Sequence, residues 1–115
     1  MAIKVLIQRK IKPGKEKELR EVVKELRSVA VRTPGYISGE TLRSIEEPSL
    51  HLVISAWKSI EDWRRWVNSS ERKALEQKTL PILEQPTKVT SYEYEFFSVN
   101  ADKALAELDY SVDGE

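Results

Sequence analysis

Apolar and polar residues alternate at the start of the chain, as in a strand with one buried face. The apolar positions of this stretch are Ile3, Val5, Ile7 and Ile11. Pro13 and Gly14 then end the alternation, and the apolar spacing becomes that of an amphipathic helix. Its inward residues are Leu19, Val22, Val23, Leu26, Val29 and Ala30. Proline and glycine at positions 34 and 35 predict the end of this helix.

The remaining pattern predicts three more strands and a second helical region. Residues 36–44 form a strand interrupted by Gly39 and Glu40, and residues 50–57 are apolar at nearly every position, as in a strand covered on both faces. Residues 59–62 match a capping box, and the helix that follows places Trp63 inward with Trp66 beside it. A serine at 69 or 70 caps a further helical segment, which Pro81 interrupts, and residues 87–97 form the last strand.

The order βαββαβ predicts an α+β, ferredoxin-like domain: a four-stranded antiparallel sheet with both long helices on one face. The other face would present Leu6 and Leu42, with either Val53 and Trp57 or Leu52 and Ile54. An apolar patch of this size is rarely exposed on a monomer, so we expect a homodimer through the sheet face. The expected domain covers residues 1–97, and residues 98–115 form an acidic C-terminal tail.

Composition narrows the classes of function. In 115 residues, 19 basic and 19 acidic side chains give no net charge, so nothing indicates a nucleic-acid partner. The absence of cysteine excludes disulfides, thiolate nucleophiles and sulfur-ligated metals. The sequence has no signal-peptide pattern and no run of about 20 apolar residues, and this predicts a cytoplasmic protein without a membrane partner.

One pattern resembles a known family. A proline-glycine turn leads into Tyr36-Ile37-Ser38-Gly39-Glu40-Thr41-Leu42-Arg43, and an apolar strand ends in Ala56-Trp57-Lys58-Ser59 before Glu61-Asp62-Trp63. These segments resemble the antibiotic biosynthesis monooxygenase superfamily over residues 3–97. The resemblance implies a dimeric α+β barrel in which each subunit has a pocket between its sheet and its helices. The superfamily includes cofactor-free oxygenases of quinols or polyphenols, haem-degrading enzymes and binding proteins, and the fold alone does not choose among them.

The haem-degrading branch can be compared residue by residue. Its members have an asparagine on the first strand, a tryptophan in a Trp-Leu-Asn-Ser-like stretch, and an iron-ligating histidine ten residues later. Here residues 66–69 match the tryptophan stretch, but Ile7 and Glu76 occupy the other two positions. Histidine is the usual neutral haem ligand. Haem binding through an atypical ligand is therefore the last of three hypotheses.

Five residues are candidates for a site. His51, the only histidine, is a candidate for proton transfer, although a lone histidine on a strand is more often a surface or hydrogen-bonded residue. Asn68 could orient a carbonyl or dioxygen-derived group, or could simply mark a helix boundary. Trp66 and Trp63 could form the aromatic wall of a pocket for a flat ligand, and Tyr36 could donate a hydrogen bond to a substrate oxygen. A structural role would also explain an aromatic side chain at each position.

The leading hypothesis is a cofactor-independent monooxygenase of a small aromatic or quinol-like substrate. In that chemistry the substrate anion itself reduces dioxygen, so the site needs a dry aromatic cavity and a base, but no metal or other cofactor. The competing hypothesis is a dimeric small-molecule-binding or stress-related module without catalytic activity. A quinol-dependent uptake of dioxygen would distinguish the two.

Overall fold

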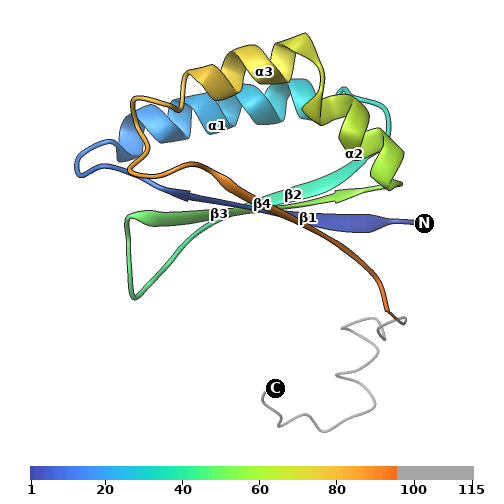
Figure 1. The fold of residues 1–115 in the computed structure, drawn as a ribbon, viewed down its shortest axis with the longest axis horizontal. Coiled ribbons are helices and arrows are strands. Elements are labelled where there is room, and N and C mark those ends of the chain that lie inside the picture. Colours follow the sequence, from blue (N-terminus) through green and yellow to red (C-terminus); the bar gives the residue numbers. More distant parts are fainter. Residues whose placement is uncertain (96–115) are drawn as a thin grey trace, which may run out of the picture.

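The structure is a computed structural model, and it describes residues 1–95. Its strands and helices follow one another in this order: β1 (Ile3–Lys10), α1 (Glu16–Ala30), β2 (Tyr36–Arg43), β3 (Leu50–Trp57), α2 (Ile60–Val67), α3 (Ser70–Gln77) and β4 (Lys88–Glu93). The strands form one antiparallel sheet in the order β2-β3-β1-β4. All three helices lie over one face of this sheet (Figure 1). The predicted α+β, ferredoxin-like fold is confirmed.

Strand register shows which side chains share a face. On β1 and β3, Ile3 lies opposite Trp57 and Ile7 lies opposite Val53, and residues directly opposite one another project from the same side of the sheet. Every second residue of β1 from Ile3 onward is buried beneath the helices. Trp57 is only 1% exposed and belongs to this core. Of the two sets that the sequence left open for the exposed face, Val53 and Trp57 lie on the helix-facing side, and Leu52 and Ile54 occupy the open face.

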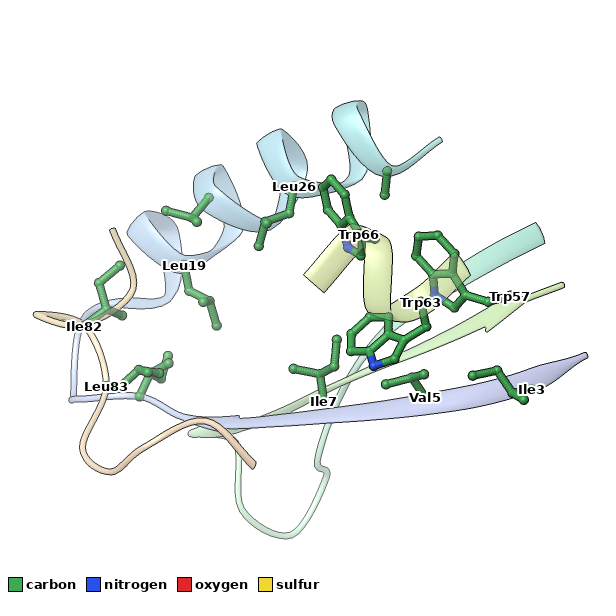
Figure 2. Packing of buried hydrophobic residues seen from close by; sticks show 13 residues of the cluster. Ile3, Val5, Ile7, Leu19, Leu26, Trp57, Trp63, Trp66, Ile82 and Leu83 are labelled. Carbon is green, nitrogen blue, oxygen red and sulfur yellow. The ribbon is translucent and has the colours of Figure 1, made fainter. Parts of the chain in front are cut away.

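The core is continuous along the whole length of α1. At one end, Leu19 packs near Ile82 and Leu83, and at the other end the tryptophans fill the space between α2 and the sheet (Figure 2). Thr79, between α3 and Ile82, is also fully buried. The predicted break at Pro81 appears as a helix end, because α3 stops at Gln77 before the proline would remove a donor.

Both short helices begin at serine caps, as the sequence predicted. The Ser59 hydroxyl accepts a hydrogen bond from the Asp62 amide at 3.1 Å and donates to the Asp62 carboxylate at 2.9 Å. Ser69 accepts from the Arg72 amide at 3.2 Å. Each cap satisfies an amide that has no partner within its own helix. The caps therefore fix where α2 and α3 begin, and with them the positions of Trp63, Trp66 and Glu76.

Gly35 sets the angle at which the chain enters β2. Its φ is +91°, and a β-carbon there would overlap the Asp62 carboxylate. Its carbonyl also accepts a 2.8 Å hydrogen bond from the Lys58 amide. Glycine is the residue that adopts this backbone conformation without strain and leaves room for the carboxylate. The following residue, Tyr36, is thereby directed toward the tryptophans.

The end of the predicted domain lies partly outside the described residues. The last strand ends at Glu93, earlier than the predicted residue 97. Residues 96 and 97 and the acidic tail at 98–115 lie outside the described part of the chain, so the domain boundary stays a prediction. Within residues 1–95, no helix is long and apolar enough to cross a membrane.

Candidate functional site

Four aromatic side chains from three elements meet between the helices and the sheet. Trp57 ends β3, and its ring is the one that contacts the other three. Its ring lies 5.3 Å from that of Tyr36 and 5.8 Å from that of Trp63, both in edge-to-face geometry, and stacks 6.3 Å from that of Trp66. The Trp57 indole N–H donates to the Ser55 hydroxyl at 3.1 Å. Edge and offset contacts of this kind favour further aromatic partners.

A cavity of about 50 Å³, the aromatic chamber, lies beside this group. Water occupies about 30 Å³ per molecule in the liquid, so the chamber as it stands is smaller than an aromatic ring and must widen to admit one. The sheet contributes to its walls Ile7, Arg9, Tyr36, Gly39, Val53, Ser55 and Trp57. Helix α1 contributes Val23, Leu26, Arg27 and Ala30, α2 contributes Trp63 and Trp66, and α3 contributes Arg72 and Glu76. The chamber therefore contains the three residues that the sequence proposed for substrate binding.

Two buried arginines share one carboxylate at the chamber wall. Glu76 on α3 accepts from Arg9 on β1 at 2.7 Å and lies 3.1 Å from an amino group of Arg72. The Arg9 side chain is 3% exposed and that of Arg72 is 9% exposed. The Arg72 guanidinium also lies 5.3 Å from the centre of the Trp63 ring, within cation–π range. One positive charge is thus left without a carboxylate.

Burial lowers the pKa of the Arg72 guanidinium from its usual value, and the neighbouring Glu76 carboxylate opposes that effect. Arg72 nevertheless stays protonated, because a guanidinium does not lose its proton in proteins. The Arg9 Nε atom is buried and has no hydrogen-bond partner in the structure. An uncompensated buried donor of a charged group is costly, and a ligand acceptor would offset that cost.

A larger opening, the basic cleft, adjoins the aromatic chamber. Its volume is about 390 Å³, within the ~300–1,000 Å³ of small-molecule sites. Arg9, Val23, Arg27 and Val53 line both spaces, so the cleft and the chamber are neighbours. The rest of the cleft is lined by Glu16, Leu19, Arg20, Lys24, Thr41, Leu42, Arg43 and His51.

His51 lies in the basic cleft, directly opposite Arg9 on β1 and Arg43 on β2. Its Nε2 atom is buried and has no hydrogen-bond partner among residues 1–95. Burial lowers the pKa of His51, Arg43 lowers it further, and Arg20 and Arg9 add smaller effects in the same direction, against Glu16. The imidazole is therefore uncharged at neutral pH and chemically able to accept a proton.

The structure separates the other predicted residues. Trp63 and Trp66 are buried in the chamber wall, and half-buried Tyr36 lies beside them. The Tyr36 hydroxyl oxygen lies against Gly39, where a β-carbon would be only 2.5 Å from it. Asn68 is exposed, lies in the wall of neither space, and donates to the Arg64 carbonyl at 2.8 Å at the end of α2. This is the helix-boundary reading of Asn68.

Sequence reasoning missed Arg9, although a signal was present. The residues of β1 that face the helices are Ile3, Val5, Ile7 and Arg9, followed by Ile11. A charged residue in phase with a buried apolar face requires a partner. That partner, Glu76, is distant in sequence and could not be identified from spacing on the strand.

The residues do not fit haem. Glu76, at the position of the iron-ligating histidine in haem-degrading relatives, is held by two guanidinium groups. The only histidine, His51, lies in the basic cleft and is absent from the chamber wall. Within residues 1–95, no three His, Cys, Asp or Glu side chains gather as a metal site would require.

Comparison with known proteins establishes the family. The family model for antibiotic biosynthesis monooxygenase matches residues 2–78. The chain belongs to this family. A 42.8 kDa protein of the whiE locus of Streptomyces coelicolor is 28% identical over 69 residues, which are 60% of this chain and 17% of that protein. The chain thus spans less than a fifth of this curated relative.

Solved structures share the monooxygenase-family fold. A conserved protein from Methanosarcina mazei has a TM-score of 0.78 at 21% identity, covering 83% of this chain and 94% of that one. SnoaB from Streptomyces nogalater, a cofactor-independent oxygenase, has a TM-score of 0.74 at 12% identity, covering 84% of this chain and 95% of that one. At such identities the similarity is one of fold.

Proposed function

We propose that this chain is a cofactor-independent monooxygenase of a small phenolic or quinol-like substrate. The observation that carries the proposal is an aromatic chamber adjoining a cleft in which an imidazole is uncharged and has no hydrogen-bond partner at Nε2. The family and the similarity to SnoaB support the same class of reaction.

Different residues bind the substrate and transfer its proton. Trp63, Trp66 and Tyr36 hold the substrate ring, because offset and edge contacts between rings favour a flat aromatic ligand. His51, at the edge of the cleft, accepts the proton of the phenolic hydroxyl. Entry of the ring requires the chamber, at about 50 Å³, to widen. Arg27 is the exposed side chain that lines both spaces, and its 2.7 Å hydrogen bond to Thr41 would have to break for it to move aside.

The reaction balances with dioxygen as the only oxidant. The phenolate transfers an electron to dioxygen, and the resulting superoxide forms a C–O bond at the ring carbon para to the hydroxyl. Protonated His51 returns its proton to the peroxide. Loss of the ring proton then breaks the O–O bond and expels hydroxide, which leaves a para-quinone and one water. One phenol and one dioxygen are consumed for each quinone formed.

The test is oxygen uptake by the purified protein with 1-naphthol, which has a free para position. We expect one dioxygen consumed for each 1,4-naphthoquinone formed. His51→Gln should lower kcat by about 100-fold, a typical contribution of a general base. Trp66→Leu should raise KM through lost ring contact. Arg32→Gln, an exposed substitution outside both spaces, is the control. Uptake no faster than in buffer would refute the oxygenase proposal.

One observation favours the second candidate, a binding module without catalytic activity. The chamber is nearly filled, and the Arg9–Glu76–Arg72 network closes one of its walls. A protein of this kind would bind 1-naphthol and consume no dioxygen.

We also propose that the chain forms a homodimer through the open sheet face. Leu6, Leu52 and Ile54 lie on that face of β1 and β3, and Leu42 adjoins Leu52 on β2. Tyr92 on β4, opposite Lys4, extends the patch and is exposed. A second sheet is the surface that matches a flat apolar face of this kind.

A further inference from the structure

The charges around the basic cleft differ from those of the chain as a whole. Basic and acidic residues are equal in number over the full sequence. Around the cleft, five cations face one carboxylate, that of Glu16; the cations are Arg9, Arg20, Lys24, Arg27 and Arg43. Within residues 1–95, Arg9 is the only one of these five that forms an ion pair. A concave surface with one sign of charge concentrates ions of the opposite sign.

Buried groups in the cleft show where an anion would bind. The Arg9 and His51 side chains come from directly opposite positions on β1 and β3, and each has a buried nitrogen without a partner. Arg43 lies opposite His51 on β2. The three side chains therefore form one row across the helix-facing side of the sheet, with neighbouring strands about 4.8 Å apart. Arg9 is 3% exposed, so its free Nε is a preformed donor and not a solvated surface charge.

The distance to the aromatic chamber limits the size of the anion's carrier. Ile7 and Val53, at the edge of the chamber, lie two residues along their strands from Arg9 and His51. Two residues of a strand span roughly 7 Å. A group bound at the row must therefore be attached to the ring that enters the chamber directly or through a very short chain.

We propose that the ligand of this protein is an aromatic carboxylate, whose acid group binds Arg9 and Arg43 in the basic cleft while its ring enters the aromatic chamber. A carboxylate matches the donor geometry of a guanidinium and forms charge-assisted hydrogen bonds. The inference rests on the proposed function for the place of the ring, but not for turnover. It defines the substrate class as a hydroxylated aromatic acid.

The test compares two probes that differ only in the acid: 1-hydroxy-2-naphthoate and 1-naphthol. Their binding to the full chain is measured by calorimetry without oxygen, so that the result does not depend on catalysis. We expect the naphthoate to bind at least about tenfold more tightly, as hydrogen bonds to a charged group predict. Inorganic phosphate should bind more weakly than the naphthoate. Equal affinities for the two naphthalene probes, or tighter binding of phosphate, would overturn the inference.

Variants locate the site. Arg9→Gln should abolish the preference for the acid, and circular dichroism shows whether this buried variant folds. Arg43→Gln is exposed, so folding should be unaffected; it should weaken naphthoate binding about threefold, as an exposed ion pair predicts, and leave 1-naphthol binding unchanged. Arg32→Gln is the matched control and should change neither. An unchanged preference in Arg43→Gln, or an equal loss in Arg32→Gln, would contradict the assignment.

Discussion

At the scale of single residues, the group that links the sheet to the helices is the pair of buried arginines that share Glu76. Two guanidinium groups and one carboxylate come from β1 and α3, and they join the sheet to the helical layer. Breaking such a network by removing its only anion leaves buried charges without compensation. Removing Glu76 should therefore destabilise the fold and disturb the wall of the aromatic chamber.

Glu76→Gln tests this contribution. We expect a loss of about 3 kcal/mol in the free energy of unfolding, because two buried cations lose their carboxylate. Glu25→Gln is the matched control: its carboxylate, on α1, pairs with Lys78, the residue after α3, but both side chains are about half exposed, so the change should be below about 1 kcal/mol. Urea denaturation measures both. Equal effects of the two substitutions would show that burial of the network does not matter.

His51 should titrate below its ordinary pKa of 6.5. Burial and the cations of the cleft disfavour its protonated form in the folded chain, so stability should fall as the pH drops below 6.5 toward the folded-state pKa. The chain has one histidine, and NMR therefore follows it without ambiguity. Arg43→Gln should raise the pKa, and Arg32→Gln should not. A pKa at or above 6.5 in the unmodified protein would contradict the uncharged base.

Residue roles could be predicted from sequence only where the pattern was local. Trp63 and Trp66 lie where the capping box placed them, in the chamber wall. Arg9 and Glu76 are separated by 67 positions, and no local pattern pairs a strand residue with a helix residue at that distance. The excess of positive charge in the cleft could not be predicted for the same reason, since it forms only when α1 packs over β1, β2 and β3.

At the scale of elements, the start of α2 positions the chamber. The Ser59 cap and the turn at Gly35 meet at Asp62, so the entry to β2 and the first turn of α2 are fixed together. Trp63 and Trp66 follow on the inward side of α2. A change at the cap should therefore reach the aromatic cluster without touching it directly.

Ser59→Ala should destabilise the protein by about 1 kcal/mol, the usual effect of losing a helix cap. It should also change the near-ultraviolet circular dichroism of the tryptophans, because α2 would no longer begin at a fixed point. Ser70→Ala, at an exposed position just inside α3, should alter neither. Thermal unfolding and circular dichroism check both variants. If Ser59→Ala left the tryptophan signal unchanged, the cap would not control the chamber.

The elements themselves followed from the sequence because each has a strong local signal. Alternation identified β1, helical spacing identified α1, and the capping serines identified α2 and α3. The face of β3 could not be assigned, because its residues are apolar at nearly every position and either set could point inward. Register with β1 decided it: Trp57 lies opposite Ile3, in the core.

At the scale of the whole molecule, the sheet separates two surfaces with different roles. The helix-facing side contains the chamber and the cleft, and the open side presents the apolar patch. Sheet-to-sheet pairing would cover that patch and leave the cleft accessible, because the two lie on opposite faces of the same strands. We therefore expect ligand binding and dimer formation to be separable by mutation.

Leu52→Lys should weaken the homodimer by placing a charge at the centre of the open face. Val31→Lys is the control, since Val31 is 54% exposed just after α1, which lies on the other face of the sheet. Sedimentation at micromolar concentration should report a dimer for the unmodified chain and for Val31→Lys, and a monomer for Leu52→Lys. A monomer in all three cases would exclude pairing through the sheet.

Isotopic labelling shows whether the protein transfers oxygen from dioxygen to the ring without a cofactor. Protein treated with a chelator is incubated with 1-hydroxy-2-naphthoate under ¹⁸O₂, and the quinone product is examined by mass spectrometry. We expect one ¹⁸O atom in each quinone, with formation strongly reduced in His51→Gln. A quinone that carries oxygen from water, or the absence of any product above the protein-free control, would contradict the oxygenase proposal.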